Sequence, residues 1–189
     1  MIAAMLLPAS YLAGSINFSI MLFKMLGKGD PRDQFSGNAG VTNVYRLAGI
    51  FWAGIVLFLD LGRACLVSWA ALYLLPTPYV PWIGLVLIIG NRFPCFHSFQ
   101  GGKGVANYLG FTAFISPLAA LSSILVWLVS YGIFRIPFIA SFFMVAVLMT
   151  GTIIVYRYEP WASAGTIATT LFILYNHKQN ALALFRKKE

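Results

Sequence analysis

The sequence predicts an all-α, multi-pass membrane protein that forms a single domain over residues 1–189. Hydrophobic residues make up 60% of the 189 residues and charged residues only 10%, and the mean hydropathy is +0.82. A soluble core of this size cannot bury so much apolar surface. Apolar stretches that approach the roughly 20 residues needed to cross a bilayer recur along the chain. Short polar segments separate them, and no soluble domain, linker or internal repeat is evident.

Six apolar stretches are candidate spans, at residues 2–23, 48–75, 79–91, 105–134, 137–156 and 160–176. We interpret the first as a span rather than a secretory signal, because no basic region follows Met1 and no small-residue cleavage site follows the apolar run. The stretch 105–134 is long for one span, and Ser116-Pro117 in its middle can break a helix. If it crosses twice, the chain has seven spans. Residues 105–116 would then form a short or re-entrant helix, since they extend only about 18 Å.

The distribution of Lys and Arg favours seven spans. In that topology 11 of the 13 basic residues share one face, whereas a single crossing would leave seven on one face and five on the other. The positive-inside rule therefore places the N-terminus outside and the C-terminus in the cytoplasm. Arg157 is then alone on the outer face, and Arg63 lies inside a span. The shared face holds Lys24, Lys28, Arg32, Arg46, Arg92, Lys103, Arg135, Lys178, Arg186, Lys187 and Lys188. This topology accounts for most of the formal charge of +8, and we expect no nucleic-acid partner because no basic stripe is present.

The first polar segment on this face is GDPRDQFSGNAGVTNVYR, residues 29–46. Its small residues let backbone amides approach a ligand, and the planar guanidinium of Arg46 can bind a phosphate. Hydrogen-bonding side chains are supplied by Ser36, Asn38, Thr42 and Asn43. An alternative for Thr42 or Asn43 alone is that they cap a helix or form turns.

The second polar segment is SFQGGKGVANYLG, residues 98–110, in which Gly101, Gly102 and Gly104 surround Lys103. It does not fit the nucleotide-binding pattern G-x-x-x-x-G-K-[ST], because His97 replaces the first glycine and Gly104 replaces the final Ser or Thr. A phosphate or acyl phosphate site at a helix N-terminus fits this composition. The alternative is that the glycines allow close helix packing and Lys103 is an interfacial anchor.

The third segment, NHKQNALALFRKKE, closes the chain and places His177 and Asn180 three residues apart on one helical face. His177 can accept a proton or bind an anionic oxygen, although a lone histidine at a span end also has ordinary structural roles. The final run, Arg186 to Lys188, is interpreted as a topology signal and a contact for anionic lipid. Within the second span, Asp60 and Arg63 predict an internal ion pair, or else Arg63 lines the same polar cavity.

Six motifs give the chain a resemblance to a known family. They are GSIN at 14–17, SGNAGVTNVYR at 36–46, LDLGR at 59–63, GNRFPCF at 90–96, FQGGKGVA at 99–106 and HKQN at 177–180. Their order and spacing resemble the bacterial acyl-phosphate:glycerol-3-phosphate acyltransferases of the PlsY type. The resemblance implies a seven-span enzyme of the bacterial inner membrane. Such an enzyme transfers an acyl group from acyl phosphate to the sn-1 hydroxyl of glycerol 3-phosphate, and it forms lysophosphatidic acid and phosphate.

Carried over residue by residue, the resemblance implies catalytic roles for Ser36, Asn38 and His177. It implies substrate-binding roles for Thr42, Asn43, Arg46, Gly101, Gly102, Lys103, Gly104 and Asn180. Arg46 and Lys103 would hold the phosphates, while Ser36 and Asn38 orient the reacting groups. The expected partners are glycerol 3-phosphate, acyl phosphate and membrane lipids. No metal or cofactor is expected, and the sequence indicates no particular oligomeric state.

The chain also departs from the family pattern. Asn91 replaces a usual His, Gln100 a Lys, Asn107 a Thr, Gln179 a Glu and Arg63 a Lys. Asn91 cannot act as a base and Gln179 carries no charge. An alternative function is therefore a non-catalytic membrane carrier or binding protein for phosphorylated lipids, which would keep the phosphate-binding cations but lose groups needed only in the transition state.

Overall fold

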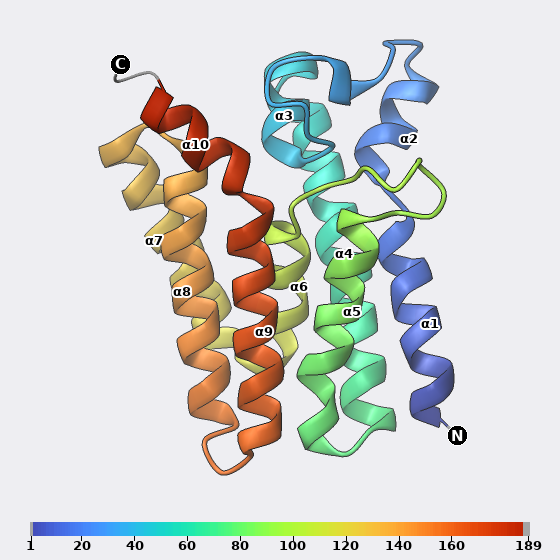
Figure 1. The fold of residues 1–189 in the computed structure, drawn as a ribbon, viewed down its shortest axis with the longest axis vertical. Coiled ribbons are helices and arrows are strands. Elements are labelled where there is room, and N and C mark those ends of the chain that lie inside the picture. Colours follow the sequence, from blue (N-terminus) through green and yellow to red (C-terminus); the bar gives the residue numbers. More distant parts are fainter. Residues whose placement is uncertain (1, 187–189) are drawn as a thin grey trace.

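The computed structural model describes residues 2–186, in which helices are joined by turns and loops and no strand is present (Figure 1). Two short 3-10 turns, η1 (Pro31–Asp33) and η2 (Thr77–Tyr79), accompany the α-helices. The α-helices are α1 (Ile2–Ser15), α2 (Phe18–Met25), α3 (Val41–Ala48), α4 (Ile50–Leu74), α5 (Val80–Arg92), α6 (Val105–Ile115), α7 (Pro117–Phe134), α8 (Pro137–Val155), α9 (Pro160–Asn176) and α10 (Lys178–Arg186).

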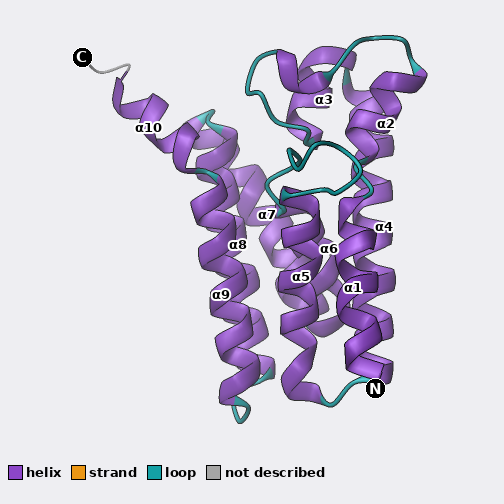
Figure 2. Cartoon of the chain, turned by 45° about the vertical axis from the view of Figure 1, so that its right-hand side comes forward, coloured by secondary structure: helices purple, strands orange, loops and turns teal. Residues whose placement is uncertain are grey.

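The long helices run up and down along one axis, and the polar segments gather at one end of the bundle (Figures 1 and 2). Helix α3, helix α10 and the loop 93–104 all lie at this end, while the N-terminus lies at the opposite end. The predicted terminal run from Arg186 to Lys188 lies outside the residues whose side chains the structure describes. Three segments that are far apart in the sequence are thus neighbours in space.

Four of the described helical segments are long and apolar enough to cross a membrane: Ala3–Met25, Ile50–Leu74, Pro117–Phe134 and Pro137–Val155. Large apolar side chains on these helices face outward, such as Leu118, which is 77% exposed. A soluble monomer rarely exposes so much contiguous apolar surface. The chain is therefore a multi-pass membrane protein whose outer surface is suited to lipid.

The first predicted span, 2–23, is interrupted after Ser15, where α1 ends, and α2 begins at Phe18. Asn17 caps α2, because its Oδ1 accepts a hydrogen bond from the N–H of Ile20 at 3.1 Å. The side chain of Arg63 on α4 donates to the carbonyl of Ile16, which the break leaves free. Asn17 and Arg63 thus satisfy a backbone N–H and a backbone carbonyl, which would cost free energy if they were left unpaired within the membrane.

The predicted break at Ser116-Pro117 is confirmed, since α6 ends at Ile115 and Pro117 opens α7. Helix α6 is short and mostly buried, and it packs closely on α4. A Cβ at Gly110 would lie 2.7 Å from the carbonyl oxygen of Leu61, so this crossing requires a residue without a side chain. The close crossing fixes the N-terminus of α6 beside the polar end of α4.

Candidate active site

A pocket of about 700 Å³ lies between the polar segments and the helices beneath them. Of the eleven residues predicted for the site, only Gly101 is not part of its described lining. The pocket brings together Ser36, Asn38, Thr42, Asn43, Arg46, Gly102, Lys103, Gly104, His177 and Asn180. The convergence of three distant segments, which the sequence predicted, is thus a feature of the structure.

The pocket has a second, apolar part between α4, α6, α7 and α8. Its lining residues there are Leu57, Leu61, Leu109, Ile124, Trp127, Leu128 and Met144. A site with polar groups at one end and apolar side chains at the other suits a ligand that has a charged head and an apolar chain.

Asn43 organises the segment before α3. It is buried, and its Nδ2 donates to the carbonyls of Pro31 at 2.6 Å and Gln34 at 3.3 Å. Its Oδ1 accepts a hydrogen bond from Oγ of Ser36 at 3.3 Å. Asn43 therefore orients the Ser36 hydroxyl and holds the loop in shape, while a contact with substrate stays a prediction.

Thr42 and Arg46 lie one turn apart on α3, and both line the pocket. The N-cap of α3 is Gly40, which makes no side-chain capping bond. The interpretation of Thr42 or Asn43 as helix caps is therefore wrong, because both residues lie inside the first turn. This leaves the hydroxyl of Thr42 and the guanidinium of Arg46 available to a ligand.

The glycines of the second segment pack against the end of α5. The N–H groups of Gly101 and Gly102 donate to the carbonyls of Arg92 at 3.1 Å and Asn91 at 2.9 Å. A Cβ at Gly102 would lie 2.7 Å from Oδ1 of Asn91, and Gly104 has a φ of +93°, in the left-handed region that favours glycine. The interpretation of close packing is thus correct, and Gly102 and Gly104 line the pocket as well.

Lys103 is a half-buried cation at the centre of the polar end. Its ammonium donates a hydrogen bond to Oδ1 of Asn180, and its carbonyl accepts one from Nδ2 of Asn176 at 3.4 Å. Burial, and next the positive charges of Arg92 and Arg46, lower the pKa of Lys103 to about 8. A bound anion would relieve both effects, so this position favours a phosphate or carboxylate.

Among the described residues, the ion pairs are Asp30–Arg32 and Asp60–Arg63. Neither includes Lys103 or Arg46. Two helices also begin at the pocket, α3 after Gly40 and α6 after Gly104. The first-turn N–H groups of a helix lack intrahelical acceptors and carry partial positive charge. Side chains and backbone together therefore give the polar end a positive potential.

His177 lies at the junction of α9 and α10 with its side chain buried. Its Nδ1 is 2.8 Å from the carbonyl oxygen of Ile173. A carbonyl can only accept, so Nδ1 carries the proton and Nε2 is the unprotonated nitrogen. Burial, opposed by the bond to Ile173 and reinforced by Lys103, lowers the pKa of His177 to about 4. The imidazole is therefore neutral at pH 7 and only weakly basic.

Five further polar residues line the pocket without having been predicted for it: Asp60, Asn91, Asn107, Arg135 and Ser141. The Asp60–Arg63 ion pair is confirmed at 2.7 Å, but it is Asp60 and not Arg63 that lines the cavity. Arg135 ends α7 in a left-handed conformation and adds a third cation. In the sequence, Arg135 stood out only as a basic residue after a predicted span, and nothing in the sequence pointed to Ser141 as a pocket residue.

The departures from the family pattern fall into two groups. Asn91 and Asn107 line the pocket, and both are buried. Gln100 and Gln179 are exposed and do not belong to the described lining. The missing charge at Gln179 therefore leaves the pocket walls unaltered.

A family model described as glycerol-3-phosphate acyltransferase matches residues 4–187. A glycerol-3-phosphate acyltransferase of Pseudomonas fluorescens (strain Pf0-1) is 36% identical over 181 residues, covering 95% of this chain and 94% of that relative. One from Halorhodospira halophila (strain DSM 244 / SL1) is 37% identical over 191 residues, covering 100% and 96%.

The fold is also similar to a solved structure. The crystal structure of PlsY, an integral membrane glycerol 3-phosphate acyltransferase, in its glycerol 3-phosphate form matches with a TM-score of 0.91 and 32% identity. The match covers 100% of this chain and 94% of that chain. The lysophosphatidic acid form matches with a TM-score of 0.88 and 31% identity.

Proposed function

Because this chain belongs to the glycerol-3-phosphate acyltransferase family, we propose that its pocket transfers a fatty acyl group from acyl phosphate to the sn-1 hydroxyl of glycerol 3-phosphate. The products are lysophosphatidic acid and inorganic phosphate, and the reaction serves phospholipid synthesis. The observation that carries this proposal is that Lys103 and Arg46 line one end of a pocket whose other end is apolar. Both substrates carry a phosphate, and the donor also carries a fatty chain.

The topology follows from the same proposal. The single domain crosses the bacterial inner membrane seven times, through α1 with α2, then α4, α5, α6, α7, α8 and α9. The N-terminus is outside, and the polar end of the pocket faces the cytoplasm, where glycerol 3-phosphate is dissolved. The gathering of α3, α10 and the loop 93–104 at the end opposite the N-terminus supports this orientation (Figure 2).

Substrate placement follows the charges of the pocket. Lys103, Arg46 and the first turns of α3 and α6 bind the two phosphates, because these positive groups lie together at the polar end. Thr42 and Asn180 add hydrogen bonds, while the N–H groups of Gly101 and Gly102 are already bonded to the end of α5. The acyl chain extends along the apolar wall formed by Leu61, Trp127 and its neighbours.

The chemical step needs no electrons from outside, because acyl phosphate is already activated. The sn-1 hydroxyl oxygen attacks the carbonyl carbon, a new ester C–O bond forms, and the bond between that carbon and the phosphate oxygen breaks. Phosphate leaves with the electron pair. Positioning of the two substrates and neutralisation of their negative charge supply most of the acceleration.

The hydroxyl proton passes to an oxygen of a substrate phosphate. A base with a pKa of about 4, the value for His177, is poorly matched to removing that proton at pH 7. The unprotonated Nε2 of His177 instead accepts a hydrogen bond from the acceptor hydroxyl and orients it. Asn38 orients the carbonyl of the donor through its amide N–H groups, while Ser36, whose proton is donated to Asn43, accepts a hydrogen bond from a hydroxyl of glycerol 3-phosphate.

Purified protein supplied with a long-chain acyl phosphate and glycerol 3-phosphate tests the proposal through phosphate release. We expect release that needs both substrates and falls by about 100-fold or more in Lys103→Ala and Arg46→Ala. Arg157→Gln, which removes a cation from the α8–α9 turn, serves as the control and should keep full activity. Binding of glycerol 3-phosphate without any turnover would instead support the carrier function.

A further inference from the structure

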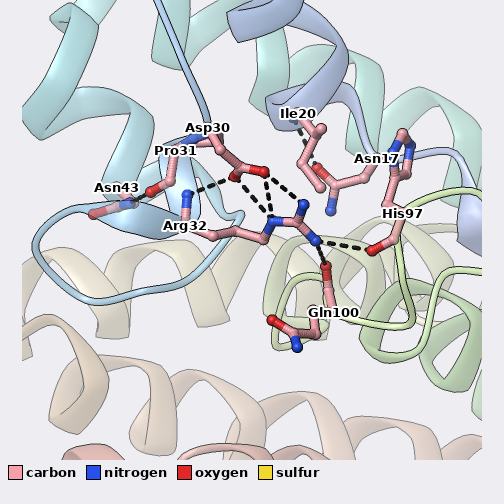
Figure 3. Close-up of polar contacts among 8 residues, drawn as sticks. All are labelled: Asn17, Ile20, Asp30, Pro31, Arg32, Asn43, His97 and Gln100. Atoms are coloured by element: carbon pink, nitrogen blue, oxygen red, sulfur yellow. Dashed lines mark hydrogen bonds and ion pairs between the residues drawn. The ribbon is translucent and has the colours of Figure 1, made fainter.

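Arg32 is the centre of a polar network that lies beside the pocket rather than in its wall. It belongs to the turn η1, and its Nε and Nη2 contact both oxygens of the Asp30 carboxylate at 2.5 to 3.0 Å. Its Nη1 donates to the carbonyls of His97 and Gln100, each at 2.8 Å (Figure 3). One guanidinium thus joins the segment before α3 to the loop between α5 and α6.

Each side of this junction continues directly into the pocket. On one side, the carbonyl of Pro31 accepts the 2.6 Å bond from Asn43 (Figure 3). Asn43 in turn accepts a hydrogen bond from the hydroxyl of Ser36. On the other side, Gln100 is followed by the glycines that lead to Lys103. A continuous path of bonds therefore runs from Ser36 through Arg32 to the backbone that carries the central cation.

The loop that Arg32 holds contains strained backbone. Ser98 and Phe99 both have a φ of 56°, a left-handed conformation that is unfavourable for residues other than glycine. Both side chains are exposed, and the Phe99 ring is 58% accessible. The carbonyls that accept from Arg32, those of His97 and Gln100, flank these two residues. Arg32 therefore fixes the loop on both sides of its strained part.

We propose that Arg32 is a positioning residue, which sets the separation between the loop carrying Lys103 and the loop that carries Ser36 and leads into α3 with Arg46. It does so without touching either substrate. This assignment rests on the proposed function, since the two loops are taken to hold parts of the same pair of reacting molecules. It goes beyond that function by naming the contact that keeps the two halves of the site in register.

The chemistry of the side chain explains why arginine is suited to this task. Its planar fork can bind a carboxylate with one edge while a further N–H pair reaches two carbonyls. An ammonium at this position cannot reproduce that geometry. A partly exposed ion pair such as Asp30–Arg32 contributes little to stability on its own. If Arg32 had only a structural role, its substitution would therefore change both the melting temperature and the rate only slightly.

The experiment compares Arg32→Gln and Arg32→Lys with Lys28→Gln in the full-length protein. Lys28 is an exposed cation at the same end of the bundle, so its loss controls for a general change in positive charge. Initial rates of phosphate release give kcat and KM for glycerol 3-phosphate, and the detergent-solubilised melting temperature reports folding. A misplacement of about 1 Å between the loops is enough to reduce kcat/KM by about 100-fold.

We expect Arg32→Gln to lower kcat by about ten- to 100-fold with a melting temperature near that of the wild type. The kcat of Arg32→Lys should lie between those of Arg32→Gln and the wild type, and the kcat of Lys28→Gln should match the wild type. The assignment of Arg32 as a positioning residue is overturned if Arg32→Gln has the same kcat as Lys28→Gln. It is also overturned if both Arg32 variants lose activity only in proportion to lost folded protein.

Calorimetric binding of glycerol 3-phosphate separates this proposal from the proposed function. If Arg32 acts through the loop of Lys103, Arg32→Gln weakens binding in the wild-type background but has little further effect in Lys103→Ala. Full additivity of the two changes would contradict the inference. A wild-type protein that binds glycerol 3-phosphate with this coupling but releases no phosphate would overturn the proposed function alone.

Discussion

Nη2 of Arg63 donates a 2.6 Å hydrogen bond to Oδ1 of Asn107, and this bond joins α4 to α6 beneath the pocket. The same nitrogen lies 2.7 Å from the carboxylate of Asp60. Another nitrogen of the guanidinium reaches the carbonyl of Ile16 at the break between α1 and α2. Arg63 and Asn107 are both departures from the family pattern. The contact indicates that they form a matched pair, in which the amide accepts from the guanidinium.

This network predicts unequal effects on stability. Arg63→Met should destabilise the protein by about 3–5 kcal/mol, because it leaves the carboxylate of Asp60 buried without its partner. Asn107→Ala should cost about 1–3 kcal/mol, since it removes one acceptor from a charged donor. Thermal unfolding in detergent measures both, with Leu66→Ala on the exposed face of α4 as the control. Equal, small shifts for all three variants would contradict the importance of the network.

The lowered pKa of Lys103 predicts how substrate binding depends on pH. Below about pH 8 the ammonium is charged and attracts the phosphate, and above about pH 8 it loses its proton and that attraction. The affinity for glycerol 3-phosphate should therefore fall between about pH 8 and 10. Because the bound anion raises the pKa of Lys103 again, the complex should take up protons as it forms at about pH 8.5.

Calorimetry in two buffers of different ionisation enthalpy measures this proton uptake. Lys103→Arg provides the matched variant, because a guanidinium stays charged throughout this range. Its affinity should be independent of pH from about 8 to 10, even if it is weaker at neutral pH. A wild-type affinity that stays constant over the same range would show that Lys103 does not supply the attraction.

The lowered pKa of His177 makes a separate prediction for stability. The unfolded imidazole titrates near 6.5 and the folded one near 4, so the unfolded state binds more protons between these values. Stability should therefore fall by about 3 kcal/mol as the pH drops from about 6.5 to 4. His177→Gln should remove much of this loss in thermal unfolding curves.

Nuclear magnetic resonance of imidazole-labelled protein gives a direct check of the same group. In a His97→Gln background, which leaves one histidine in the chain, the remaining ring signal should stay constant from about pH 5 to 8. A signal that titrates near pH 6.5 would mean that His177 is basic enough to remove a proton, and that the assignment of this step to substrate phosphate is wrong.

Local chemistry explains why much of the fold was predictable from the sequence. The apolar stretches predicted the long helices. Pro117 predicted the break before α7, because the proline ring cannot be accommodated in the preceding helical turn. Convergence of the three polar segments followed from charge and topology. The break at Ile16 was not predicted, because it depends on Asn17 and on Arg63, which reaches in from another helix.

The site was predictable where residues act through their own segment. Arg46 and Lys103 were found because each stands beside small residues in a polar stretch. Arg135 and Ser141 were missed because only the rotation of α7 and α8 turns them toward the pocket. Asn43 was predicted as a substrate ligand, but its burial and its bonds to Pro31 and Gln34 arise from tertiary packing.

The glycines of the loop give the last prediction. A Cβ at Gly102 would lie 2.7 Å from Oδ1 of Asn91 and 3.3 Å from the carbonyl oxygen of Ala39. Gly102→Ala must therefore displace either the buried side chain of Asn91 or the loop itself, and it also forces a small shift away from the segment before α3. Since a shift of about 1 Å at a catalytic site can reduce the rate by about 100-fold, we expect a large loss of kcat/KM.

Gly54→Ala on α4 is the matched control, because a Cβ at this position would meet no atom within 4 Å and the backbone there is helical. It should keep full activity and gain about 0.5–1 kcal/mol in stability from the better helix former. Phosphate release and thermal unfolding of the two variants, measured side by side, test the argument. If Gly102→Ala retained the rate of Gly54→Ala, the close fit of the loop to Asn91 would have no role in placing Lys103.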